Sequence, residues 1–158
     1  MKHLIVMLFA LAALSGFADV ESALAKPQSF ARWVIGEGTR EDTVINPVTD
    51  HCVKLFPRND AKLGACVVHG LLAVRPKLVA DWERGVGIVA RDQSAACKQA
   101  IHAYWLAAKR NIKATTLYFE SHRQTGSTRL QAELSSQPYS TLESQKDDAK
   151  GHAVAVCG

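Results

Sequence analysis

The stretch QSAACKQAIHAYWLAAKRN, residues 93–111, carries the strongest helical pattern in the chain. Apolar side chains recur on one side of a helix drawn through it, at Ala96, Cys97, Ala100, Ile101, Tyr104, Trp105 and Ala108. Asp92 is suited to cap the start of this helix, and Lys109 and Arg110 suit the negative end of its dipole. The pattern therefore predicts a long amphipathic helix whose apolar side faces a core.

Further helices are predicted from capping residues and from apolar side chains at helical spacing, over 46–56, 59–74 and 76–89. Pro47 is expected in the first turn of one helix, and Pro76 is expected to interrupt the chain between two others. Gly85 and Gly87 are expected to weaken the helix that contains them. A short helix is predicted around 130–134.

Three segments have the composition of strands. Residues 113–122 are rich in β-branched and aromatic residues, residues 152–158 alternate as a strand does, and residues 30–35 form a third candidate. We expect a small, mainly helical domain with a minor antiparallel sheet. The alternative fold class is α+β.

The amino terminus reads MKHLIVMLFALAALSGFA, in which a short basic start precedes an apolar run and small residues. This order is typical of a secretory signal peptide, and the run is too short for an ordinary membrane-spanning helix. Cleavage is predicted after Ala18, with Ala25 as the alternative. Residues 19–158 are then one exported globular domain, in the periplasm or outside the cell, with no transmembrane segment after processing.

The cysteines are Cys52, Cys66, Cys97 and Cys157. An even number in an exported chain predicts two disulfides, for which three pairings exist. A helical hairpin about Arg58 would place Cys52 and Cys66 at similar distances from its turn, which leaves Cys97 to join Cys157. Oxidised cysteines are not thiolate ligands or nucleophiles, so we expect no metal and no cofactor despite His69 one turn after Cys66.

Basic residues are concentrated towards the middle of the chain, although the formal net charge is only +4. A basic face with aromatic neighbours suits an anionic envelope polymer or an acidic protein, whereas export excludes intracellular nucleic acid. The candidate binding residues are Lys109, Arg110, Lys113, Arg123, Arg129 and Tyr118. The alternative is an ordinary solvated surface.

Glu120 is the candidate catalytic residue, because it is the single acid in this basic segment. Glu120 and Ser121 resemble the catalytic Glu-Ser pair of lytic transglycosylases, which cleave peptidoglycan. The resemblance covers two residues and implies a general acid at Glu120. The apolar helix around that pair and the Gly-Leu-Met-Gln-like segment of the family are absent from this chain.

No nucleophile elbow, phosphate-binding loop or dinucleotide fingerprint occurs in the sequence. We therefore expect a non-catalytic protein that binds another protein or an envelope component, as an inhibitor, immunity factor or accessory subunit does. The alternative is a small secreted cell-wall glycan hydrolase that uses Glu120.

Overall fold

The structure is a computed structural model that describes residues 29–158. The predicted signal peptide and both predicted cleavage sites lie outside the described residues. The described part is helical, and it contains both disulfides.

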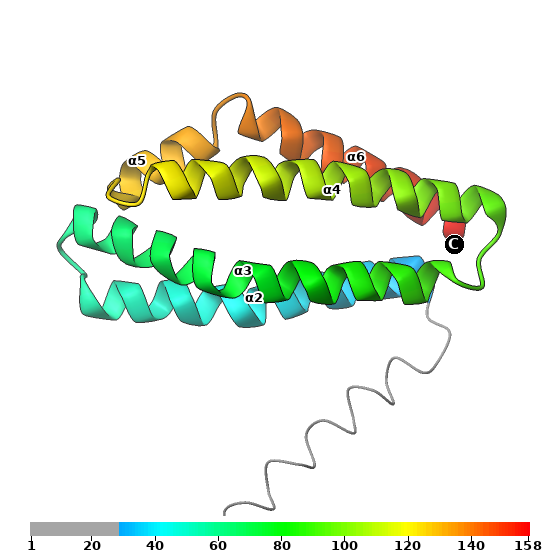
Figure 1. The fold of residues 1–158 in the computed structure, drawn as a ribbon, viewed down its shortest axis with the longest axis horizontal. Helices are drawn as coiled ribbons and strands as arrows, with labels where there is room; N and C mark the ends of the chain where they lie inside the picture. Colours follow the sequence, from blue (N-terminus) through cyan, green and yellow to red (C-terminus); the bar gives the residue numbers. More distant parts are fainter. Residues whose placement is uncertain (1–28) are drawn as a thin grey trace, which may run out of the picture.

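Two layers of helices lie side by side (Figure 1). One layer is a hairpin of α2, Phe30–Leu55, and α3, Asp60–Ala90. The other contains α4, Ala95–Ser121, followed by the short α5, Ser127–Leu134, and by α6, Tyr139–Cys157, which packs along α4. The connection between the layers is short, because α4 begins only five residues after α3 ends.

Three helices begin at a side-chain cap. Ser29, Asn59 and Ser94 each accept a hydrogen bond from a backbone N–H three residues later. The prediction that Asp92 caps the long helix is wrong, because Ser94 holds the cap position with its hydroxyl 3.2 Å from the amide nitrogen of Cys97.

The predicted position of Pro47 and the predicted interruption at Pro76 are also wrong. Pro47 lies inside α2 rather than in its first turn, and α3 continues through Pro76 and Gly85 as one helix of 31 residues. At Gly85 a Cβ atom would lie 2.6 Å from Nε1 of Trp33, so glycine allows the indole to pack against the helix backbone. Packing between α2 and α3 thus outweighs the local preference of these residues.

No strand occurs among residues 29–158, so the predicted minor sheet is wrong for this part of the chain. Residues 30–35 lie in α2, residues 113–121 complete α4, and 152–157 complete α6. The Thr115 hydroxyl bonds to the carbonyls of Asn111 and Ile112 within its own helix, which accommodates a β-branched polar residue there. Tyr118 and Phe119 are buried in a group with Val68 of α3 and Leu130 of α5, which further stabilises the helical conformation of this segment.

All four cysteines are paired, in the arrangement that the hairpin model suggested. Cys52–Cys66 joins α2 to α3, and Cys97–Cys157 joins the start of α4 to the end of α6. Each disulfide therefore lies within one layer, and the layers are held against each other by non-covalent contacts.

Two separate groups of buried side chains hold the layers together. The first core lies beside the Cys97–Cys157 disulfide between α4 and α6. It includes Phe30, Trp33, Ile101 and Trp105. The second core contains Val68, Tyr118, Phe119 and Leu130, from α3, α4 and α5. The region between the two cores is the part of the interface that is not closely packed.

By length and composition alone, α3 is apolar enough to cross a membrane, although the sequence predicts no transmembrane segment after processing. Its apolar window has a mean hydropathy of 1.4, and 11% of that window is buried. One such helix is weak evidence for a membrane span, and several apolar side chains of α3 line a cavity between the two layers.

Candidate functional site

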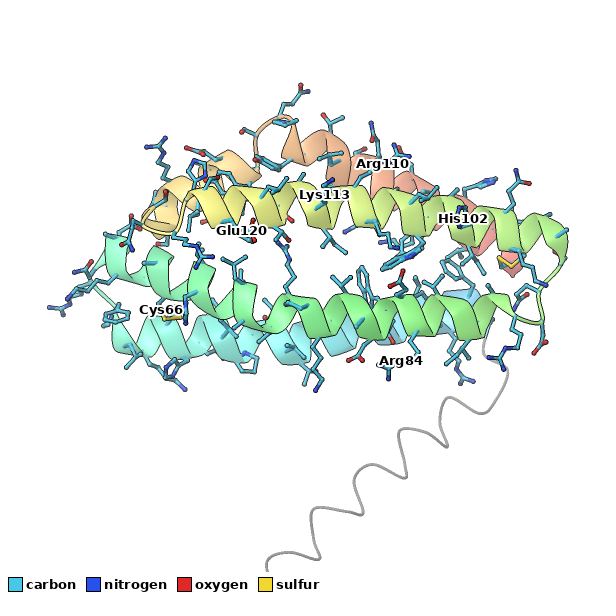
Figure 2. All side chains as sticks on the ribbon, in the orientation of Figure 1. Cys66, Arg84, His102, Arg110, Lys113 and Glu120 are labelled. Atoms are coloured by element: carbon cyan, nitrogen blue, oxygen red, sulfur yellow. A yellow bond between two sulfur atoms is a disulfide. The ribbon has the colours of Figure 1, made fainter. Side chains whose placement is uncertain are left out.

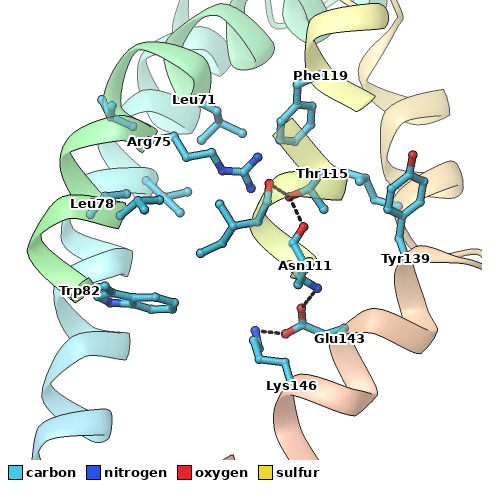
Figure 3. A pocket seen from close by; sticks show the side chains of 15 residues that line it. Leu71, Arg75, Leu78, Trp82, Asn111, Thr115, Phe119, Tyr139, Glu143 and Lys146 are labelled. Carbon is cyan, nitrogen blue, oxygen red and sulfur yellow. Dashed lines mark hydrogen bonds and ion pairs between the residues drawn. The ribbon is translucent and has the colours of Figure 1, made fainter. Parts of the chain in front are cut away.

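A cavity of about 470 Å³ lies between the layers, with α3 on one side and α4 and α6 on the other (Figure 3). Its volume is within the usual range for small-molecule sites, roughly 300 to 1,000 Å³. The cavity is lined by Ile45, Leu71, Val74, Arg75, Leu78, Val79, Trp82, Asn111, Ile112, Thr115, Phe119, Leu134, Tyr139, Glu143 and Lys146.

The walls of the cavity are mainly apolar. Leu71, Leu78 and Trp82 follow one another at helical spacing along α3 and face α4 across the cavity. Ile112 and Phe119 form the apolar part of the opposite wall. These residues would be core residues in a tighter bundle, and here they surround space because the layers stand apart between the two cores.

The polar side chains on the side of α4 and α6 satisfy one another (Figure 3). Asn111 is buried and donates through Nδ2 to one Glu143 carboxylate oxygen at 2.9 Å. The other Glu143 oxygen pairs with Lys146. This group is therefore a fixed polar edge of the cavity, and the remaining wall is mainly apolar apart from Arg75 and Thr115.

Arg75 reaches across the cavity from α3 to α4. Its Nη1 donates to the Thr116 hydroxyl at 3.1 Å, and its guanidinium carbon lies 5.0 Å from the centre of the Phe119 ring. The cavity is thus lined by two cations, Arg75 and Lys146, and by one carboxylate, Glu143.

The structure does not bring the predicted basic surface together. Lys109 points to the other layer, where its Nζ lies 2.6 Å from Glu83 and above the Trp105 ring. The hydrogen bond from Lys109 lowers the pKa of the Glu83 carboxyl. Arg129 is on α5 and pairs with Glu133.

The other members of that set are divided as well. Tyr118 is 4% exposed and belongs to the second core, so it does not contribute to a surface. Arg110 and Lys113 are exposed along α4 (Figure 2). Arg123 lies beyond the end of α4, beside a second hollow.

This second hollow, called the tip hollow below, has a volume of about 450 Å³ and lies beside the α2–α3 turn. It is lined by Phe56, Lys62, Ala65, Cys66, His69, Arg123 and Gln124. Cys66 and His69 therefore do share one site, but the Cys66 sulfur is bonded to Cys52. Among residues 29–158 no group of three or more histidine, cysteine or acidic side chains could hold a metal ion.

Glu120 is exposed near the end of α4 (Figure 2) and lines neither the cavity nor the tip hollow. A general acid for glycan cleavage works beside the bond it protonates, usually with a second carboxylate across the site. The hydrolase function stays a prediction, because neither the cavity nor the tip hollow contains Glu120.

Asp60 has a structural role that the sequence did not indicate. Its Oδ1 accepts hydrogen bonds from the Ser127 hydroxyl and from the backbone N–H and hydroxyl of Thr128. These bonds lower the pKa of the Asp60 carboxyl, with the Ser127 bond as the largest cause. Because α5 lacks a side-chain cap of its own, a residue 67 positions earlier caps it.

Comparisons with known proteins do not extend this description. No protein-family model matches the chain, and no curated protein and no solved structure matches it. Arguments about function therefore start from the cavity and the tip hollow.

Proposed function

We propose that this protein is a non-catalytic exported protein that binds an envelope component, and that the component is an anionic amphiphile held in the cavity. A fatty acid is the simplest molecule of this class. The observation that carries the proposal is the apolar cavity of about 470 Å³ with Arg75 and Lys146 among its lining residues. Two disulfides support a location in an oxidising compartment, as the periplasm or the outside of the cell provides.

The chemistry of the walls favours a hydrocarbon chain over a sugar. Burial of apolar surface contributes roughly 25 cal/mol for each Å², and the row of Leu71, Leu78 and Trp82 offers such surface. A sugar would need many hydrogen-bond partners, whereas Asn111 and Glu143 are already engaged with each other. Arg75 and Lys146 already contact Thr116 and Glu143, and their charges can still attract a single carboxylate or phosphate at one end of the ligand.

The arrangement of the disulfides supports entry between the layers. Neither bond joins the two layers, so the layers can separate over the cavity without breaking a covalent bond. The polar contacts between the layers that border the cavity and would open in this motion include Arg75 with Thr116 and Lys109 with Glu83. Lys109 and Glu83 are both exposed, and exposed pairs contribute little to stability.

The test is competition between a fluorescent fatty acid and unlabelled ligands. Val74→Phe combined with Thr115→Phe places bulk in the cavity from opposite walls, and we expect at least tenfold weaker binding. The matched control is Leu106→Phe combined with Leu117→Phe, because both leucines are exposed on α4 outside the cavity. Circular dichroism verifies that both variants are folded.

Two further ligands test the anion. Arg75→Gln should weaken binding of the fatty acid while leaving binding of the matching fatty alcohol nearly unchanged. Equal binding by the cavity variant and the native protein would refute the proposal, as would failure of the native protein to bind any of these ligands.

A second candidate is a protein partner on the outer face of α4. Leu106, Arg110, Lys113 and Leu117 are all exposed and recur at helical spacing, which places them on one stripe. Apolar and basic side chains together suit an acidic partner. Capture of a stoichiometric partner from an envelope extract, lost on Arg110→Glu with Lys113→Glu and retained by the cavity variant, would favour this function over the first.

A further inference from the structure

We propose that the tip of the α2–α3 hairpin docks on an anionic lipid surface, and that the tip hollow receives the phosphate of a lipid head group. The site uses other residues than the cavity and lies beside the hairpin turn, so it is independent of what the cavity holds. It would bring the protein to a membrane.

The tip hollow has the lining of an anion site. Lys62 and His69 come from α3, and Arg123 and Gln124 come from the segment after α4. No carboxylate is among the described residues that line it. Phe56 and Ala65 provide its apolar part, and Cys66 is held in a disulfide, so no thiol competes for the ligand.

Exposed apolar side chains lie directly beside this hollow in the chain. Val53 is 45% exposed and Leu55 is 53% exposed, at the end of α2. They alternate with cations, because Lys54 stands between them and Arg58 follows in the turn, both exposed. Val53 and Leu55 lie on different sides of the last turn of α2, so the apolar side chains and the cations surround the hairpin tip. Cationic and apolar side chains together are the combination by which proteins bind the interface of anionic membranes.

Nearby acids keep their charge but do not line the hollow. The Asp60 carboxylate accepts three hydrogen bonds from the start of α5. Asp50 is exposed one turn before Lys54 and does not line the hollow. The phosphate would therefore meet Lys62 and Arg123 with no acid of the lining beside them.

The exposed apolar residues Val53 and Leu55 distinguish a phosphate of a membrane lipid from a free phosphate ion as the ligand. A free phosphate ion would use the cations alone and gain nothing from Val53 and Leu55. A lipid surface uses both, because the head group meets the cations while the apolar side chains enter the interface. We therefore assign the site to a lipid head group in a membrane.

The experiment is co-sedimentation with vesicles of phosphatidylglycerol and phosphatidylcholine, compared with phosphatidylcholine alone. The protein is isolated from the producing cell with the amino terminus that it carries there. Lys62→Gln combined with Arg123→Gln should lower the partition coefficient on anionic vesicles by roughly 30-fold, since each basic residue near such a surface contributes about fivefold. The control is Arg110→Gln combined with Lys113→Gln, which removes the same charge from α4 and should change binding less than threefold.

A matched pair of valines tests the apolar part. Val53→Ser should weaken vesicle binding, whereas Val156→Ser should not, because Val156 is similarly exposed at 40% but lies near the end of α6. An unchanged melting temperature shows that each variant is folded.

Three results would overturn the proposal. The first is equal binding to both kinds of vesicle, and the second is an equal loss in the two charge variants. The third is retained binding by Val53→Ser together with complete displacement by millimolar inorganic phosphate, which would assign the site to a free anion. The outcome does not depend on the cavity, since the Val74 and Thr115 variant should bind vesicles as the native protein does.

Discussion

The two disulfides should differ in their contribution to stability, because they close loops of different length. Cys52–Cys66 spans 14 residues and Cys97–Cys157 spans 60. The chain-entropy relation gives about 3 kcal/mol for the shorter loop and about 4 kcal/mol for the longer one. Cys52 and Cys97 are equally buried, so the loss of side-chain packing on replacement by alanine should be similar in both cases.

Urea unfolding followed by circular dichroism measures this difference. The native protein is compared with Cys52→Ala combined with Cys66→Ala, and with Cys97→Ala combined with Cys157→Ala. We expect the second variant to be less stable than the first by about 1 kcal/mol at equal slope. A larger loss in the first variant would refute the reasoning, since it would mean that the α2–α3 hairpin depends on its disulfide in the folded state.

Four other substitutions test packing and ionisation. Gly64→Ala should lower the stability by about 1 to 3 kcal/mol, because its Cβ would lie 2.1 Å from the Thr125 carbonyl oxygen. Gly87→Ala should raise the stability by about 0.5 to 1 kcal/mol, since no described atom lies within 4 Å of its Cβ. Equal effects of the two substitutions in urea unfolding would contradict the close approach at Gly64. The lowered pKa of Asp60 means that its carboxylate stabilises the protein above the unfolded pKa near 4 and that this contribution is lost as pH falls through the lower folded pKa. Melting temperatures of Asp60→Asn should therefore fall less steeply with acid than those of the native protein, and parallel curves would argue against the cap. Burial, and then the nearby Glu133 carboxylate, raise the pKa of Tyr118 to about 12, so stability should fall by up to about 2 to 3 kcal/mol between pH 10 and 12, where the unfolded chain ionises first. Tyr118→Phe should remove that part of the alkaline loss, and an unchanged loss would show that Tyr118 ionises normally in the folded protein.

The sequence predicted those elements whose information is local. The apolar side predicted for α4 is buried at Cys97, Ala100, Ile101, Tyr104, Trp105 and Ala108, as their spacing indicated. Ala96, the first residue predicted on that side, is exposed. The disulfide pairing is the one of three possible pairings that the predicted hairpin about Arg58 suggested, since two helices joined by a short turn can place Cys52 beside Cys66. The helix and the Cys52–Cys66 bridge involve only neighbouring residues or one turn, whereas Cys97–Cys157 joins residues 60 positions apart.

The errors arose where contacts distant in sequence override local preference. Pro76 does not end α3, because the helix continues along α2 and the other layer. The β-branched and aromatic segment before His122 is helical, since Tyr118 and Phe119 bury against Val68 and Leu130. A strand pattern and a helix face are hard to distinguish when apolar residues are frequent.

The cavity could not be predicted, although each of its residues was visible in the sequence. Leu71 and Val74 were expected on the apolar side of a helix, and they are. Whether such a side is packed or lines a cavity depends on the distance between the layers. That distance follows from the two cores at the ends of the interface, which involve residues from every helix.

The disulfides and the cavity are linked by the thermodynamics of the fold. A cavity in the interface gives up packing that a closed bundle of this length would have, and such losses destabilise the folded state. Cross-links within each layer restrict the unfolded chain and offset that loss without holding the layers together. A disulfide between the layers would stabilise the fold as well, but it would restrict the separation by which we propose that a ligand enters. The placement of both disulfides inside the layers is therefore the arrangement that the proposed entry route needs.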